Sequence, residues 1–527
     1  MTDISKGIAL ADEQLLAELG YKQEFKRAFS PVQVFGIAFS IIGLLPSIAS
    51  VLFYPMQNGG PVSMVWGWAI MSAGIMLVGL SMAELASAAP TSGGLYFWTF
   101  SLSSPRYRNV LCWIVGYANT IGSIAAVASI DWGAASQIAA AASIGSDGAF
   151  EATNAQLFGI YVAIVISHAI ICGLATPVLA KLQTLFIGLN VLLCLAVIIA
   201  LPATTPAENM NSASFALGGF ENLYGWNDGF AFLLAGLAPL WTICSFDSTV
   251  HISEEASNAA TAVPWAIVSA IGIAGVLGWA INVSLAFCMG SDIAALAESD
   301  QPMADIFLRS FGAKGTLAVW AFVVIVQYMM GSSMLLSASR QTFAFARDGA
   351  LPLSRFLYRM NTRTGTPVNT VWFCASWSIV LGLLAFAGEG QAINAVFTIS
   401  VTALYVAYSI PICARWMGRN EFRPGPFDLG VFSLPVGISG VLFMLLMGIV
   451  FLFPSTPETT VQDMNYSVVV TAGVLVLSLV WYFFPRYGGR YWFSGPVRTV
   501  DSDVYPGTGS AASTIEGRDG GDEMGQK

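Results

Sequence analysis

The residue best placed to do chemistry is Asp247, which lies inside a long apolar stretch within the polar run Ser245-Phe246-Asp247-Ser248-Thr249. An ionisable side chain inside a lipid bilayer costs several kcal/mol and usually serves a function. A carboxylate there can exchange a proton or hold a positively charged amine, and the sequence does not separate these roles. Alternatively the stretch ends before Asp247, although Glu254 and Glu255 fit such a water-exposed end better.

Two apolar stretches are interrupted by glycine and proline. Gly43 and Pro46 interrupt the first stretch, and Gly236 and Pro239 precede Asp247 in the sixth. Proline lacks an N–H and clashes with the preceding turn, so each pair predicts a broken helix or, alternatively, a simple kink. A broken helix exposes N–H groups that attract a carboxylate and C=O groups that attract an ammonium. Two facing breaks would therefore bind a zwitterion.

The positions of these breaks predict the substrate-binding residues. Interrupted helices five spans apart are typical of a transporter built from inverted repeats. Trp241 could stack on a cationic amine or simply pack, and Asn119 could contact the substrate or form an interhelical hydrogen bond. The predicted substrate-binding residues are Gly43, Leu44, Pro46, Ser47, Asn119, Trp241, Ser245, Phe246 and Asp247.

Four charged residues are candidates for proton coupling or gating: Asp247, Glu84, Lys181 and Asp131. Glu84 could pair with an arginine to latch an inner gate, or lie alone at the membrane interface. Asp131 could line an outer vestibule or simply be hydrated. Lys181 lies near the start of its apolar stretch, where reaching to the membrane surface is the preferred interpretation. His168 fits an interhelical hydrogen bond better than a proton relay.

The composition indicates that these residues lie in a membrane protein. Of 527 residues, 56% are apolar and 10% are charged, and the mean hydropathy is +0.69. Soluble domains carry about 25% charged residues. Helices satisfy every backbone group within lipid, so we expect an all-α polytopic protein. The twelve predicted transmembrane helices span residues 32–54, 62–88, 110–140, 156–174, 177–201, 229–254, 264–290, 315–345, 369–388, 391–415, 430–453 and 465–485.

The basic residues predict the orientation of these helices. Of the 22 lysines and arginines, 20 fall on one side, and only Arg309 and Lys314 lie opposite. By the positive-inside rule, both termini are then cytoplasmic. We expect a cytoplasmic N-terminal segment over 1–30, with a short amphipathic helix, and a transmembrane domain over 31–485. A cytoplasmic, disordered tail is expected over 486–527. Residues 1–30 do not resemble a signal peptide.

Several function classes are disfavoured by the sequence. All seven cysteines lie in apolar spans, so no disulfide framework is expected. With two histidines and no clustered ligand motif, we expect no metal site and no cofactor. The formal net charge of −9 argues against nucleic-acid binding. The chain has no nucleophile–base cluster, so we do not expect an enzyme. The sequence does not indicate an oligomeric state.

Four segments resemble a known family. The segment 83–98 (AELASAAPTSGGLYFW) resembles the second-helix motif of the amino acid–polyamine–organocation (APC) transporters. The segments 245–264 (SFDSTVHISEEASNAATAVP) and 19–26 (LGYKQEFK) resemble the fungal amino acid/choline branch. Within that branch, the segment 43–50 (GLLPSIAS) is most similar to the permeases for γ-aminobutyrate (GABA).

The resemblance implies a LeuT-like fold of two inverted five-helix repeats plus two C-terminal helices. It implies proton-coupled import of GABA or a related ω-amino acid by alternating access. Trp241 and Asp247 match the aromatic and acidic positions of the sixth helix. In two places the chain departs from the family: leucines and Pro46 replace a Gly-Ser-Gly pattern, and Lys181 lies nearer the start of its helix than the lysine of some bacterial members, with Asn190 deeper.

Several alternatives remain open at this stage. The substrate could be another small amine, such as choline, a polyamine or an α-amino acid. A sensor that binds an amino acid without transporting it is disfavoured by the short tails. The expected partners are a small zwitterionic substrate, a proton and the lipid bilayer. The plasma membrane is the expected location, with the vacuolar membrane as the alternative.

Overall fold

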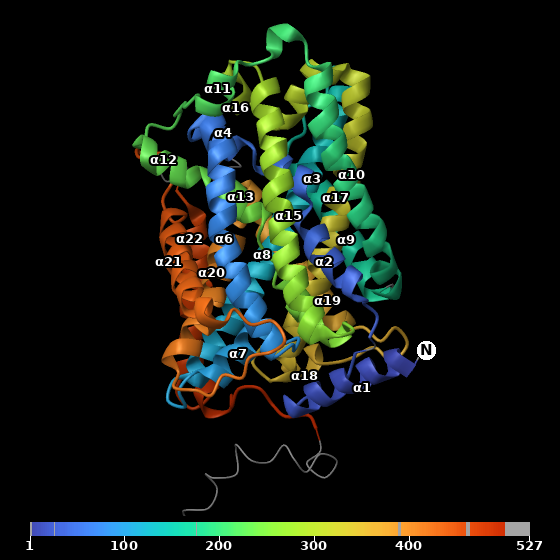
Figure 1. The fold of residues 1–527 in the computed structure, drawn as a ribbon, viewed down its shortest axis with the longest axis vertical. Coiled ribbons are helices and arrows are strands. Elements are labelled where there is room, and N and C mark those ends of the chain that lie inside the picture. Colours follow the sequence, from blue (N-terminus) through green and yellow to red (C-terminus); the bar gives the residue numbers. More distant parts are fainter. Residues whose placement is uncertain (1–2, 26, 175, 388–391, 460–463, 501–527) are drawn as a thin grey trace, which may run out of the picture.

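The computed structural model describes residues 3–25, 27–174, 176–387, 392–459 and 464–500. These residues form a bundle of helices without a β-sheet among them (Figure 1). The main helices are α1 (Asp3–Glu18), α2 (Pro31–Ile42), α3 (Leu44–Val51), α4 (Phe53–Gln57), α6 (Trp68–Ala88), α7 (Gly94–Leu102), α8 (Arg108–Gly145), α9 (Asn154–Leu174), α10 (Thr176–Thr204), α11 (Ala213–Gly218), α12 (Asp228–Ala235), α13 (Leu237–Thr242), α14 (Ser248–His251), α15 (Ala259–Cys288), α16 (Ile293–Ala297), α17 (Pro302–Arg347), α18 (Ser354–Leu357), α19 (Val368–Gly382), α20 (Ala395–Met417), α21 (Ser433–Val450) and α22 (Tyr466–Phe483).

The long helices run roughly parallel between two faces of the molecule (Figure 1). Helices α1, α7 and α18 lie at one end, which we call the terminal face because both ends of the described chain pack there. Helices α4, α11 and α16 lie at the other end, which we call the opposite face. Within the described residues, eleven helical stretches are long and apolar enough to cross a membrane.

The predicted sixth span, 229–254, differs from the prediction of twelve membrane-crossing helices. Its apolar helical part covers only Asp228–Thr242, as α12 and α13, and is too short to count as a full span. The chain then leaves the helix and resumes it in α14. Pro239 cannot donate a backbone hydrogen bond, and Ser245 has a φ of 57°, which no α-helix contains. The first span, Pro31–Val51, also breaks where expected, at Gly43.

Helices α8 and α17 form the centre of the bundle. Helix α8 packs against α17, α20, α7 and α9, while α15 packs against α6 and α2. Small residues permit these close approaches. A Cβ atom placed on Gly116 of α8 would lie 2.2 Å from the ring of Phe345 in α17. The two central helices therefore depend on glycine at this crossing.

Both ends of the chain pack on the terminal face. Residues 28 and 29 donate their N–H groups to the carbonyl of Glu255 at 2.9 and 3.1 Å. Near the other end, Thr499 donates its N–H to the carbonyl of Gly20 at 2.9 Å. Residues 486–500 thus differ from the disordered tail expected over 486–527, because they form backbone hydrogen bonds and bury Phe493. Residues 501–527 lie outside the described residues.

The contact at Gly116 gives a stability prediction. We expect Gly116→Ala to lower the melting temperature of the purified protein in detergent, since overpacking a rigid core costs roughly 1–3 kcal/mol. The matched control is Gly188→Ala in α10, where a Cβ meets nothing within 4 Å. This control should melt at or above the wild-type temperature. Equal melting of both variants and the wild type would contradict the close crossing of α8 and α17.

Candidate functional site

The first helix break separates α2 from α3 at Gly43. The φ of 42° and ψ of 58° at Gly43 lie in the left-handed region, which glycine adopts without a Cβ penalty. Ser47 donates its hydroxyl to the Ile42 carbonyl at 2.6 Å and so satisfies one group freed by the break. Within the described chain, the N–H groups of Leu44 and Leu45 have no backbone acceptor. The start of α3 can therefore bind an anion.

The second break lies between α13 and α14. The chain leaves the helix at Ile243 and resumes it at Ser248. As far as the structure describes the chain, the N–H groups of Ser245, Phe246 and Asp247 also lack backbone acceptors. Helix α13 packs against α3, and α14 packs against α2. The two breaks therefore lie side by side, as a site for a zwitterion requires.

Asp247 is held by three side chains from three helices. Its Oδ1 accepts a hydrogen bond from the Tyr408 hydroxyl of α20 at 2.6 Å. Its Oδ2 accepts one from Asn119 Nδ2 of α8 at 2.9 Å and lies 3.2 Å from His251 Nε2 of α14. The side chain is buried, with 2% exposure. A buried carboxylate persists only with such partners, so this arrangement fixes the ionisable group at the break.

A vestibule opens at the opposite face, above the two breaks. It is a cavity of about 540 Å³ between α4, α13 and α20, and none of the described residues that line it is acidic or basic. Its lining includes Leu237 of α13 and Thr398 of α20. One turn after Leu237 in α13, the ring of Trp241 packs on the ring of Phe397 in α20 with centroids 4.8 Å apart, and both are buried. These rings therefore lie between the vestibule and Asp247.

Two methionines of α17 fill the space beside the breaks. Met330 Sδ lies 3.4 Å from Ser47 Oγ, and a Cβ at Gly43 would come within 2.7 Å of that sulfur. Met334 Sδ lies 4.0 Å from Ser248 Oγ in the second break. Methionine is unbranched and flexible, so these side chains can move aside for a small ligand.

The other predicted gating residues lie away from Asp247. Lys181 is exposed on α10. Asp131 of α8 is fully buried, and its Oδ2 lies 3.2 Å from Nδ1 of His168 in α9. It does not line the vestibule described above. Neither interpretation offered for Asp131, a vestibule wall or a hydrated acid, matches this buried pair.

Glu84 forms an ion pair on the terminal face. Both of its oxygens accept hydrogen bonds from the guanidinium of Arg415 at the end of α20. Ser433 of α21 donates to the same carboxylate at 2.6 Å. The pair ties α6 to α20 and α21, as a latch requires. Glu84 is fully buried, so the alternative of an isolated interfacial acid is wrong for this structure.

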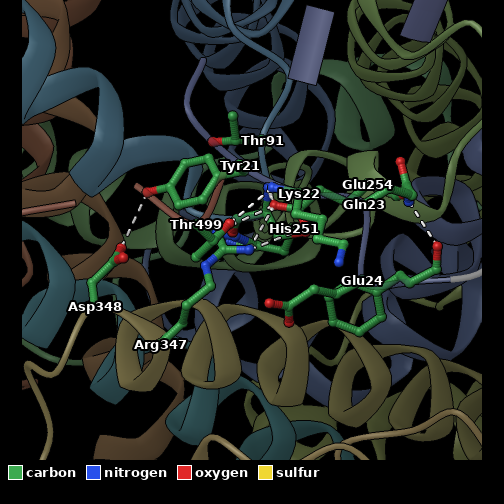
Figure 2. Close-up of polar contacts among 12 residues, drawn as sticks. Tyr21, Lys22, Gln23, Glu24, Thr91, His251, Glu254, Arg347, Asp348 and Thr499 are labelled. Carbon is green, nitrogen blue, oxygen red and sulfur yellow. Dashed lines mark hydrogen bonds and ion pairs between the residues drawn. The ribbon is translucent and has the colours of Figure 1, made fainter. Parts of the chain in front are cut away.

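A second ion pair lies beneath the central site. Glu254 Oε2 lies 3.2 Å from Arg347 Nη1, and Arg347 lies 3.9 Å from the ring centroid of Tyr21. Figure 2 shows Tyr21 reaching Asp348 on one side, while Gln23 donates to the Glu254 carbonyl on the other. The N-terminal segment thus covers this pair. Glu254 and Glu255, expected at a water-exposed end, are buried instead, because arginines of α17 neutralise both.

Comparisons with known proteins identify the family of this chain. The sequence model of a family described as "Amino acid permease" matches residues 29–474. A GABA-specific permease from Saccharomyces cerevisiae is 41% identical over 502 residues, covering 94% of this chain and 87% of that one. The chain belongs to the amino acid permease family. It is therefore a multi-pass integral membrane transporter of amino acids within the APC superfamily, and not an enzyme.

Further relatives cover most of the permease. An uncharacterised amino-acid permease from Schizosaccharomyces pombe is 38% identical, covering 93% of this chain and 89% of that one. An amino-acid permease from Arabidopsis thaliana is 33% identical, covering 92% of this chain and 96% of that one. A solved manganese transporter from Eremococcus coleocola has a TM-score of 0.53 at 14% identity, covering 85% of this chain and 92% of that one. This last likeness concerns the fold alone.

Among the residues that sequence reasoning missed are two that contact Asp247. His251 stands four residues after Asp247, which places it on the same side of a helical turn, and it is one of only two histidines in the permease. That combination was a usable signal. Tyr408 gave a weaker one, since it is one of 16 tyrosines and its span could not be aligned with Asp247 from sequence alone.

Asp348, directly after α17, gives a pH-dependent prediction. Burial raises the pKa of its carboxyl from 3.8 to about 6. The carboxyl accepts hydrogen bonds from Tyr96 at 2.7 Å and from the N–H of Val497 at 2.9 Å. Because the folded pKa lies above the unfolded one, this group favours folding below about pH 4 and loses that contribution as the pH rises through 6. The full difference is roughly 3 kcal/mol.

Melting temperatures at about pH 5 and about pH 7.5 test this sign. The wild type should gain stability at the lower pH relative to Asp348→Asn, which cannot titrate. The exposed Glu421→Gln serves as a control on the same face. An equal pH response of wild type and Asp348→Asn would show that Asp348 does not titrate in this window.

Proposed function

We propose that this permease imports GABA or a related ω-amino acid together with a proton, by alternating access. The observation that carries the proposal is the position of Asp247, buried between two broken helices with free N–H groups nearby. An ω-amino acid separates its carboxylate from its ammonium by a flexible chain. The carboxylate binds the N–H groups at the start of α3, and the ammonium binds Asp247. Met330 and Met334 cover the methylene chain between them.

The two faces of the molecule support the direction of transport. The vestibule opens at the opposite face, whereas ion pairs close the terminal face beneath Asp247. The excess of lysine and arginine places the terminal face in the cytoplasm. This conformation therefore receives substrate from outside, and the packed rings of Trp241 and Phe397 lie between the vestibule and Asp247. We propose the plasma membrane as the location, with the vacuolar membrane as the alternative.

The breaks also support an internal repeat. The first break lies in the first span and the second in the sixth, as two inverted five-helix repeats require. Two further helices, α21 and α22, would follow the second repeat. In this scheme Glu84 and Arg415 latch the cytoplasmic side and must separate when the substrate is released.

Uptake measurements in a permease-deficient host test this proposal. We expect saturable uptake of labelled GABA that falls when a protonophore collapses the pH gradient. Asp247→Asn should reduce uptake by about 100-fold, since a buried charged hydrogen-bond partner contributes up to about 3 kcal/mol. The matched control is Asp147→Asn, which removes an exposed carboxylate at a positive φ that asparagine tolerates.

Competition then identifies the substrate class. Unlabelled ω-amino acids should compete with labelled GABA, whereas choline, polyamines and α-amino acids should compete weakly. Full uptake by a correctly delivered Asp247→Asn variant would remove Asp247 from the mechanism. Stronger competition by choline or a polyamine would identify that compound, and not GABA, as the substrate. Saturable binding without accumulation would favour a sensor.

A further inference from the structure

We infer that His251 and Asp247 together hold the transported proton, and that the backbone of Ser92 links its release to the cytoplasmic gate. This inference rests on the proton coupling proposed above and names the residue that carries it. His251 is 1% exposed and touches both the substrate site and the loop between α6 and α7. It is the one described side chain that bonds both to Asp247 and to this loop.

The hydrogen bonds of His251 fix how many protons the pair holds. Nδ1 lies 3.0 Å from the carbonyl oxygen of Ser92, which can only accept, so Nδ1 carries a hydrogen. Nε2 lies 3.2 Å from Asp247 Oδ2, and this contact also needs a hydrogen, on either the ring or the carboxyl. In both arrangements the His251–Asp247 pair contains one proton more than a neutral imidazole with a carboxylate. The pair is then electrically neutral, as its burial favours.

Besides this pair, Asp348 is a buried carboxyl on the same side of the molecule, beside Arg347. Tyr408 donates to the other oxygen of Asp247. Of the elements that pack against α14, helices α2 and α15 contribute no acidic or basic residue. Helix α17 contributes Arg340 and Arg347, which pair with Glu255 and Glu254 respectively. The neighbouring charges are thus compensated, and a proton lost from the His251–Asp247 pair leaves a net negative charge at the break.

Loss of the proton breaks one of the two bonds of His251. If Nδ1 keeps its hydrogen, the Nε2 lone pair faces the carboxylate of Asp247, and the repulsion breaks this contact. If Nε2 keeps the hydrogen, the Nδ1 lone pair faces the Ser92 carbonyl, and the loop is released. The only bond that breaks chemically is the N–H or O–H bond, and the proton passes to water at the terminal face.

Ser92 connects this event to the gate. Its N–H donates to Glu254 Oε1 at 3.0 Å, and Glu254 pairs with Arg347. The backbone of this one residue therefore contacts His251 through its carbonyl and the gate through its N–H. Figure 2 places His251 close to Glu254 and Arg347, beneath the N-terminal segment. Release of the loop would weaken the contacts that close the cytoplasmic side.

Proteoliposomes with the membrane potential clamped at zero test this role. With one proton per substrate, an inward gradient of one pH unit supports about a tenfold accumulation of GABA in the wild type. His251→Gln keeps a donor toward Asp247 but cannot titrate. We expect this variant to exchange labelled for unlabelled GABA at a reduced but measurable rate, while its accumulation ratio falls to about one and GABA no longer acidifies the lumen.

The matched control is His168→Gln, which removes the other buried histidine and should retain coupling. Wild-type accumulation and acidification by His251→Gln would overturn the inference while leaving the proposed function intact. Loss of exchange by a folded variant would also overturn it, because His251 would then act in substrate binding. Absence of GABA transport and acidification in the wild type would instead contradict the proposed function.

A second measurement needs no variant at His251. In the His168→Gln protein with isotope-labelled histidine, His251 gives the only histidine ring-nitrogen signals of the chain. We expect GABA to change the protonation state that these signals report. If the signals stay unchanged when GABA is added across the pH range of transport, the proton does not reside on this pair.

Discussion

Every peptide group inside a bilayer needs a hydrogen-bond partner, and this constraint governs the whole structure. Most of the chain meets it with long α-helices. At Gly43 and at residues 243–247 the helical hydrogen bonds stop in two elements that lie side by side. The surrounding helices shield these groups from lipid, and Ser47 caps one exposed carbonyl. The backbone N–H groups that have no backbone acceptor are available to a charged solute. The site therefore consists of backbone groups as well as side chains.

The carboxylate at the second break imposes its own requirements. A buried acid is stable only when donors surround it, and α8, α14 and α20 each supply one partner to Asp247. Buried acids nearer the terminal face are stabilised in the same way: Glu84, Glu254 and Glu255 each form an ion pair with an arginine. Breaking such a pair inside the protein is costly. These ion pairs therefore stabilise one conformation. They separate only when the binding of substrate or of a proton offsets the free energy of breaking them.

Much of the fold followed from the sequence, because lipid leaves few alternatives. Hydropathy located the spans, and Gly43 with Pro46 located the first break, whereas the second break lies at residues 243–247, after Gly236 and Pro239. Asp247 and Asn119 were predicted at the site, and they share a hydrogen bond. The helical part of the sixth span is shorter than predicted because the chain unwinds around Ser245. Partners such as Tyr408 and the arginine beside Glu84 come from distant spans. A single sequence does not show which residues of such spans lie at the same depth and face each other. The order of residues 486–500 likewise arises from contacts with the N-terminal segment.

The central claim is that the two breaks and Asp247 bind the amino acid substrate between them. An experimental structure determined with GABA present tests this most directly. The account predicts density for GABA between α3 and α14, with the amine at Asp247, the carboxylate at the N–H groups of Leu44 and Leu45, and Met330 displaced. Density confined to the vestibule above Trp241, with the donors of Asp247 unchanged, would contradict the account.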